Sequence, residues 1–156
     1  LKYNSLTNLI KARQFTSEEF WEILSFKDEI IFRSFAAIYI YNNGQIEVIE
    51  SGPTVSDMIV FGNKLIVAGG NKGLFELTEK KLKPLKNQSL LKGKTIIDMT
   101  VWEDKLLIGT KLHGCFIMEG NNIYSWKPEL NEELKTQQIN KILSYNKNQI
   151  AFGMSC

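Results

Sequence analysis

Several residue types are scarce in this 156-residue chain, and each scarcity excludes a class of site. Two cysteines, Cys115 and Cys156, are too few for a disulfide framework or a cysteine-based metal site. His113 is the only histidine, so a histidine metal cluster has no second ligand and a His-led catalytic triad has no alternative base. No phosphate-binding loop, nucleophile elbow or paired metal-ligand motif occurs. We therefore expect no metal, no cofactor and no catalytic residue in this chain.

The chain also lacks a strong charge of either sign. Its 19 basic and 17 acidic residues give a net charge of +2, which offers no electrostatic reason for binding nucleic acid or an anionic membrane. No apolar run is long enough to cross a bilayer, because the apolar region of residues 21–41 is interrupted by charged residues. Among them are Lys27, Asp28, Glu29 and Arg33. We expect no nucleic-acid contact, and membrane contact only through other parts of a parent protein.

An internal repeat runs through most of the sequence. Residues 20–49, 55–85 and 96–126 align with almost no gaps, and a fourth copy begins at residue 139. Repeats of this period are stacked supersecondary units, each of which buries its apolar face against its neighbours. Each copy begins with an apolar stretch that ends in an aromatic residue, so we expect these aromatics to lie in the core between units. They are Phe26, Phe61, Trp102 and Tyr145.

Each copy predicts a sheet of four antiparallel strands. A polar turn of two or three residues follows the aromatic, short enough for a tight hairpin, and a second apolar strand comes next. A third strand begins near a small residue and leads through another polar turn to a fourth, more polar strand. The strand segments are rich in β-branched and aromatic residues, which disfavours helix. Helical turns are expected only in residues 4–19 and 127–138, between copies.

Four-stranded sheets repeated around an axis form a β-propeller, with apolar inner strands near the axis and a polar last strand in water. Length varies mainly in the links between copies (residues 50–54, 86–95 and 127–138), as expected of stacked repeats. We therefore predict an all-β chain of β-propeller blades: complete blades at about 20–49, 55–85 and 96–126, and an incomplete blade from 139.

Propellers usually close with about four to eight blades. The chain begins at Leu1 without an initiator methionine or a signal peptide. We therefore expect it to be a fragment of a larger propeller, with residues 1–4 as the end of an earlier blade. The alternative is that several copies of the chain complete one ring.

The loops that join the second strand to the third emerge on the propeller face that usually holds the ligand. Their aromatic group and hydrogen-bond donors suit a small molecule or an oligosaccharide, although the same residues are also common in turns chosen for solubility. The six candidate ligand-binding residues are Arg33, Phe35, Asn71, Lys72, Lys111 and His113.

Three further residues have structural roles in this prediction. Asp57 and Asp98 occupy one column near the blade interfaces, where we expect their carboxylates to brace neighbouring strands through hydrogen bonds rather than to act as acid or base. Cys115 occupies a column of leucine and isoleucine, so we expect it to be buried as a small hydrophobic residue.

The best-formed copy has an apolar residue, Asp and a second apolar residue, then a turn, then Lys-Leu-Leu-Ile-Gly-Thr, then Gly-Cys-Phe, at residues 97–99, 105–110 and 114–116. This motif resembles the two-component-regulator propeller repeat, and the resemblance of the chain covers about residues 20–156. The usual tryptophan of the second strand is Leu107 here, and the first copy lacks the glycines. The resemblance implies the periplasmic sensor region of Bacteroidetes hybrid two-component systems, followed by a triple-tyrosine β-sandwich, a membrane span and a kinase or helix-turn-helix output.

The resemblance implies sensing, often of glycan-derived signals, by a ligand that biases a dimer of propellers. Two alternatives remain open: an interaction scaffold of the WD-repeat kind, and a propeller enzyme such as a polysaccharide lyase or a glycosidase whose catalytic blades lie outside this chain.

Overall fold

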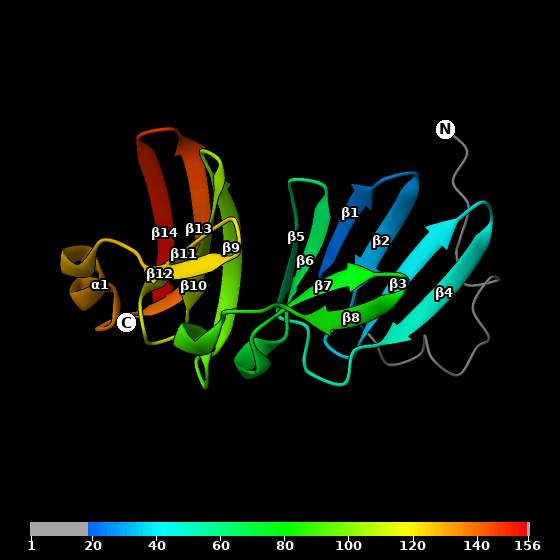
Figure 1. Ribbon diagram of the computed structural model, residues 1–156, viewed down its shortest axis with the longest axis horizontal. Helices are drawn as coiled ribbons and strands as arrows, with labels where there is room; N and C mark the ends of the chain where they lie inside the picture. Colours follow the sequence, from blue (N-terminus) through cyan, green and yellow to red (C-terminus); the bar gives the residue numbers. More distant parts are fainter. Residues whose placement is uncertain (1–18, 156) are drawn as a thin grey trace. The chain divides into compact units, whose positions relative to one another are not determined.

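The computed structural model describes residues 19–155, which form two compact units that meet at residues 54 and 55. Among the described residues the chain forms fourteen β-strands in four antiparallel sheets, with one short α-helix and two 3₁₀ turns (Figure 1). The prediction of an all-β chain of four-stranded antiparallel sheets is confirmed. The helical turns expected in residues 4–19 and the role expected of residues 1–4 lie outside the described residues.

The first unit holds one sheet in the order β1-β2-β3-β4. Its strands are β1 (Glu22–Phe26), β2 (Glu29–Arg33), β3 (Ala37–Asn42) and β4 (Gln45–Glu50). The hairpin between β3 and β4 turns at Asn43 and Gly44, both with positive φ, which is the conformation that two-residue hairpins require. Tyr39 is buried under Phe20, with ring centroids 5.0 Å apart.

The second unit holds two four-stranded sheets and a two-stranded one. The first comprises β5 (Asp57–Phe61), β6 (Lys64–Ala68), β7 (Leu74–Thr78) and β8 (Lys81–Pro84). The second comprises β9 (Ile96–Trp102), β10 (Lys105–Thr110), β11 (Cys115–Glu119) and β12 (Asn122–Ser125). The pair β13 (Gln138–Asn146) and β14 (Gln149–Ser155) forms the third.

The sheets of the second unit bury their second strands most completely. From Leu65 to Ala68 and from Leu106 to Thr110 every residue is buried, whereas β8 and β12 are largely exposed. Two apolar clusters join the sheets, one around Leu106 and Met99 between the first two sheets, the other around Ile142 and Trp126 between the second and the pair β13–β14. The expected gradient from apolar inner strands to a polar last strand is confirmed.

Each of these two apolar clusters forms a seam, the packed space between two neighbouring sheets. A carboxylate bridges each seam. Asp57 Oδ2 accepts a hydrogen bond of 2.6 Å from the Met99 N–H of the next sheet. One repeat later, Asp98 Oδ2 accepts one of 2.6 Å from the Ile142 N–H, while its Oδ1 lies 2.6 Å from Lys141 Nζ. Both aspartates are buried, and an ionised acceptor roughly doubles the strength of such a bond. The predicted bracing role of Asp57 and Asp98 is confirmed.

The links between sheets are held by side-chain amides. Gln88 Oε1 accepts the Leu74 N–H at 2.7 Å, and Asn131 Oδ1 accepts the Cys115 N–H at 2.8 Å, so both fix the start of a third strand. A Cβ on Gly73 or Gly114 would meet these amide oxygens within 2.4 Å and 2.6 Å, and both glycines have positive φ. Glycine is therefore required before the third strand, because the backbone there has a positive φ and because a Cβ would collide with the amide oxygen of Gln88 or Asn131.

The helical turns expected between copies are present in the last link. Helix α1 (Pro128–Leu134) starts with a proline, whose fixed φ suits the first turn, and carries Asn131. Two 3₁₀ turns, η2 (Gly70–Lys72) and η3 (Ser89–Leu91), occupy other connections.

The aromatic column is core in two copies and not in the fourth. Phe61 and Trp102 pack against the two clusters of the second unit, as predicted. Tyr145 is 75% exposed, and Leu143 on the same strand is 58% exposed. The prediction for Tyr145 is wrong because no other sheet among residues 19–155 covers that face of β13.

Candidate functional site

Four of the six candidate ligand-binding residues lie on connections of the second unit that leave one edge of its sheets. Asn71 and Lys72 belong to η2 between β6 and β7, and Lys111 and His113 lie between β10 and β11; all four are exposed. The second loop is rigid at its base, because Thr110 Oγ1 donates to the Gly114 carbonyl at 2.7 Å and accepts the His113 N–H at 3.2 Å. Ligand binding by these residues stays a prediction.

The other two candidates lie in the first unit and differ from each other. Phe35 is 51% exposed beside Trp21, with ring centroids 5.2 Å apart. Arg33 lies at the end of β2 and is buried, and its Nε donates to Glu22 Oε2 at 2.7 Å. The guanidinium therefore holds β1 against β2 instead of projecting from the loop.

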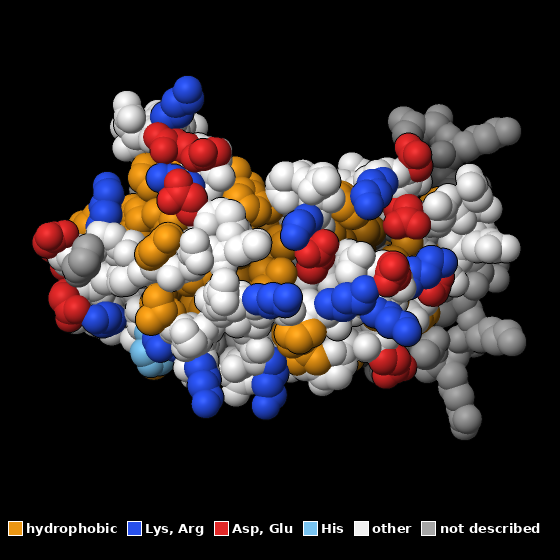
Figure 2. Space-filling model, viewed as in Figure 1, with side chains coloured by type: hydrophobic (Ala, Val, Ile, Leu, Met, Phe, Trp, Pro, Cys, Tyr) orange, Lys and Arg blue, Asp and Glu red, His pale blue; other side chains and the backbone are white. Residues whose placement is uncertain are grey.

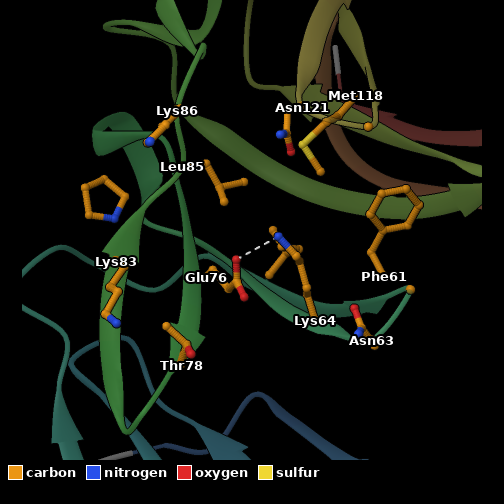
Figure 3. A pocket seen from close by; sticks show the side chains of 14 residues that line it. Phe61, Asn63, Lys64, Glu76, Thr78, Lys83, Leu85, Lys86, Met118 and Asn121 are labelled. Carbon is orange, nitrogen blue, oxygen red and sulfur yellow. Dashed lines mark ion pairs between the residues drawn. The ribbon is translucent and has the colours of Figure 1, made fainter.

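The second unit contains a cavity of about 520 Å³ at the opposite edge of its sheets (Figure 3). The cavity lies beside the turn at Gly62–Asn63 and the turn at Gly120–Asn121, which join first to second and third to fourth strands. In an antiparallel sheet of sequential strands these turns leave the edge opposite to the connections of Asn71 and Lys111. None of the six candidate residues lines the cavity.

Apolar side chains from three elements form the walls of the cavity. Phe61 ends β5, Leu85 follows β8, and Met118 belongs to β11 of the next sheet. Figure 3 shows Leu85 and Met118 on either side of the open space, with Phe61 beside it. The volume lies within the range of about 300–1,000 Å³ typical of small-molecule sites.

Charged groups line the rest of the cavity. Lys64 Nζ and Glu76 Oε2 form an ion pair of 3.0 Å across its lower side, drawn as a dashed line in Figure 3. Lys83 lies at the rim and bonds the exposed Glu79 carboxylate at 2.7 Å, and this hydrogen bond lowers the pKa of Glu79. Lys86 is exposed at the rim and forms no ion pair with any residue from 19 to 155.

The equivalent space in the next seam is filled. The Leu85 N–H bonds the Leu74 carbonyl at 2.9 Å, and the Trp126 N–H bonds the Cys115 carbonyl at 3.0 Å, so Trp126 is the counterpart of Leu85. Trp126 is 4% exposed and packs against Trp102 at 6.1 Å and against Phe152 at 5.9 Å between centroids. Two indoles thus occupy positions that Phe61 and Leu85 leave partly open one repeat earlier.

Lys127 follows Trp126 as Lys86 follows Leu85. Its ammonium lies 5.2 Å from the Trp126 ring centroid and 5.7 Å from that of Trp102, the range of cation–π attraction. Lys127 therefore lies within reach of both aromatic rings of its own seam.

Other reactive groups of the described residues have structural roles. Cys115 is fully buried, as predicted, and burial raises the pKa of its thiol to about 12. Within residues 19–155 no cluster of histidine, cysteine or carboxylate residues has the arrangement of a metal site. No helix in that part of the chain is both apolar and long enough to span a bilayer. On the face seen in Figure 2, positive and negative side chains are interspersed within each unit.

Sequence reasoning missed the cavity because it looked for ligands at the other loop edge. The signal was present in the last column of the aligned copies, where Leu85 stands against Trp126. Leucine has a much smaller side chain than tryptophan. Such a difference in side-chain volume at equivalent positions of two otherwise similar seams indicates open space.

No family model matches the chain, and no curated protein matches it. Among solved structures it is similar to the extracellular domain of a protein assigned to a hybrid two-component system of B. thetaiotaomicron, with 16% identity and a TM-score of 0.69. That alignment covers 88% of this chain and 19% of the other, so the chain spans about a fifth of that domain.

Two more structures share the fold. The computationally designed Ika4 protein is 7% identical, with a TM-score of 0.64 over 90% of this chain and 88% of that one. YCF48 bound to a D1 peptide is 11% identical, with a TM-score of 0.61 over 81% of this chain and 44% of that one. Repeated four-stranded sheets, the carboxylates between them and these similarities identify the fold of this chain as that of consecutive β-propeller blades.

Proposed function

We propose that this chain is part of the ligand-sensing propeller of a bacterial two-component or one-component transmembrane regulator, located outside the cytoplasm in the periplasm. The observation that supports this most is the similarity to the extracellular domain of a hybrid two-component system over 88% of the chain. The resemblance of residues 97–116 to the two-component-regulator propeller repeat supports it independently of the coordinates. The parent protein supplies the membrane span and a kinase or transcription output.

In this proposal the ligand is a small molecule or an oligosaccharide. Asn71, Lys72, Lys111 and His113 supply hydrogen-bond donors from loops whose bases are fixed by the sheets. Rigid sheets suit a sensor because binding energy is then spent on changing the arrangement of whole propellers, for instance in a homodimer, rather than on ordering the blade. A ligand shifts such an equilibrium only by its difference in affinity for the two states.

A thermal-shift screen against a panel of oligosaccharides tests the proposal. A ligand present at about 100 times its Kd stabilises the protein by about 2.7 kcal/mol, which corresponds to a rise in Tm of roughly 5–10 °C. The double variants Asn71→Ala/Lys72→Ala and Lys111→Ala/His113→Ala should lose this shift while keeping the unliganded Tm.

Lys81→Ala, which changes an exposed lysine at the start of β8 near the opposite edge, is the matched control and should keep the shift. A shift that survives both double variants would contradict the assignment of these loops. If no oligosaccharide binds and a peptide does, the interaction-scaffold alternative gains support, as does the parallel with YCF48 and its D1 peptide.

A further inference from the structure

The cavity beside Leu85 differs from the filled seam beside Trp126 by aromatic rings. Both seams share the bridging aspartate, the strand register and a lysine directly after the wall residue. In the filled seam the space between the sheets holds Trp126 against Trp102. In the open seam the counterparts of these two residues, Leu85 and Phe61, line a cavity of about 520 Å³. The side chains that differ between the two seams at these positions are indole rings.

The walls of the open seam suit an aromatic ring. Phe61 offers an edge or face for ring stacking, a contact worth about 0.5–1.5 kcal/mol beyond burial. Met118 lines the same space with a thioether, and sulfur contacts with aromatic rings are favourable by about 0.3–1.5 kcal/mol. Leu85 lies across the open space from Met118 (Figure 3).

The charged residues at the rim of the cavity favour the binding of an anion. Glu76 is the acidic residue of the lining and is paired with Lys64, and Lys83 is engaged by Glu79. Lys86 remains as a cation without an ion-pair partner in the described part of the chain. Its counterpart Lys127 lies over the indoles of its own seam, and Lys86 follows the wall residue of the open seam at the same point of the repeat.

We infer that the cavity between the first two sheets of the second unit binds a small aromatic carboxylate. The ring lies among Phe61, Leu85 and Met118, in the place that Trp126 takes in the next seam, and the carboxylate pairs with Lys86. This site is distinct from the loop residues of the proposed sensing face and lies at the other edge of the sheets. It gives the propeller a second ligand, held within the seam between two blades.

Methyl-detected NMR titration of the whole chain with indole-3-acetate tests the inference. Saturable shifts are expected for the Met118 methyl and the Leu85 methyls, with contacts from the indole protons to Met118. Leu85→Trp fills the cavity from within and should abolish these shifts. Leu112→Trp, at an exposed position on the opposite loop edge, adds the same side chain without filling the cavity and should leave binding unchanged.

The charge is tested separately with indole, which lacks the carboxylate. Lys86→Gln should weaken indole-3-acetate about two- to fivefold, the effect of one exposed ion pair, and should leave indole unaffected. Lys92→Gln, an exposed lysine on the same link, is the matched control. Because oligosaccharide binding is measured at the other edge, failure here and failure of the sensing proposal are distinguishable.

Shifts that map to another part of the chain, or no saturable shift in the wild type, would overturn the inference. So would unchanged binding in Leu85→Trp, shown to be folded by its amide spectrum. If Leu85→Trp does not fold, the intermolecular contacts to Met118 in the wild type decide the matter.

Discussion

The two seams of the second unit join similar sheets in different ways. Between the first two sheets the wall residues are Phe61 and Leu85, and a cavity remains; between the second sheet and β13–β14 they are Trp102 and Trp126, and the space is filled. Both seams keep an aspartate hydrogen-bonded to the next strand. The comparison teaches that both seams share the bridging carboxylate, while the aromatic positions decide whether a seam is packed or keeps a cavity.

Trp126→Leu should have the largest effect, because it copies the open seam into the filled one. Loss of a buried indole and the cavity left behind cost about 2–4 kcal/mol of unfolding free energy. Chemical denaturation measures the loss. Trp126→Phe is the control and should cost clearly less, because the Trp126 Nε1 has no hydrogen-bond partner among the described residues. An equal loss in the two variants would mean that ring volume is not what stabilises this seam.

Asp57→Ala and Asp98→Ala should each destabilise the chain by about 2 kcal/mol, since each leaves a buried N–H without its acceptor. We expect the two losses to agree within about 1 kcal/mol, because each aspartate accepts an equivalent buried N–H one repeat apart, and the ion pair of Asp98 with the 70% exposed Lys141 contributes little. Denaturant unfolding of both variants measures this. A loss confined to one variant would show that the seams are not braced in the same way.

Cys115, the buried thiol of the described residues, lies in the filled seam. Alkaline pH should therefore lower the stability of the filled seam and not that of the open seam. The pKa of the Cys115 thiol is about 12 in the folded chain, which is higher than in the unfolded chain. The contribution of this thiol to the free energy of unfolding is therefore fully present below about pH 9. This stability is lost as pH rises from about 9 towards 12, by about 1–2 kcal/mol at pH 10. The difference in unfolding free energy between wild type and Cys115→Val, measured from pH 7 to 10, should follow this course. A difference that stays constant would contradict it.

The smallest effect concerns the two lysines after the wall residues. Lys127→Gln should lose about 0.5–1 kcal/mol, because it removes a cation from above two indoles. Lys86→Gln should change stability by less than about 0.5 kcal/mol, as expected of an exposed residue without a ring beneath it. Thermal unfolding of the pair shows the contrast, and equal losses would remove the cation–π explanation.

Much of the fold followed from the sequence because the repeat places equivalent residues in columns. Neighbouring residues indicate the strand alternation and the short turns. The shared position in the aligned copies indicates the role of the aspartates at positions 57 and 98. The column did not determine what covers each face: Tyr145 aligns with Phe61 and Trp102 but is exposed. Burial depends on a neighbouring sheet, which a column does not specify.

Three contacts or spaces around the candidate sites could not be predicted from the sequence, each for a physical reason. Arg33 looked like a free donor, yet Glu22 on the neighbouring strand engages it, a contact that needs the pairing register to be known. The amide clamps of Gln88 and Asn131 lie in links of different length, so no alignment brings them into one column. The cavity depends on volumes on two sheets at once, which only the packed structure combines.

The central claim is that successive sheets of the second unit pack face to face across aromatic seams bridged by a carboxylate. An NOE spectrum of labelled protein tests it most directly. The account predicts contacts between the Trp126 indole and the Phe152 ring, whose centroids are 5.9 Å apart on two different sheets. Absence of these contacts in a folded, assigned spectrum, with Trp126 contacting only residues of β9 to β12, would contradict it.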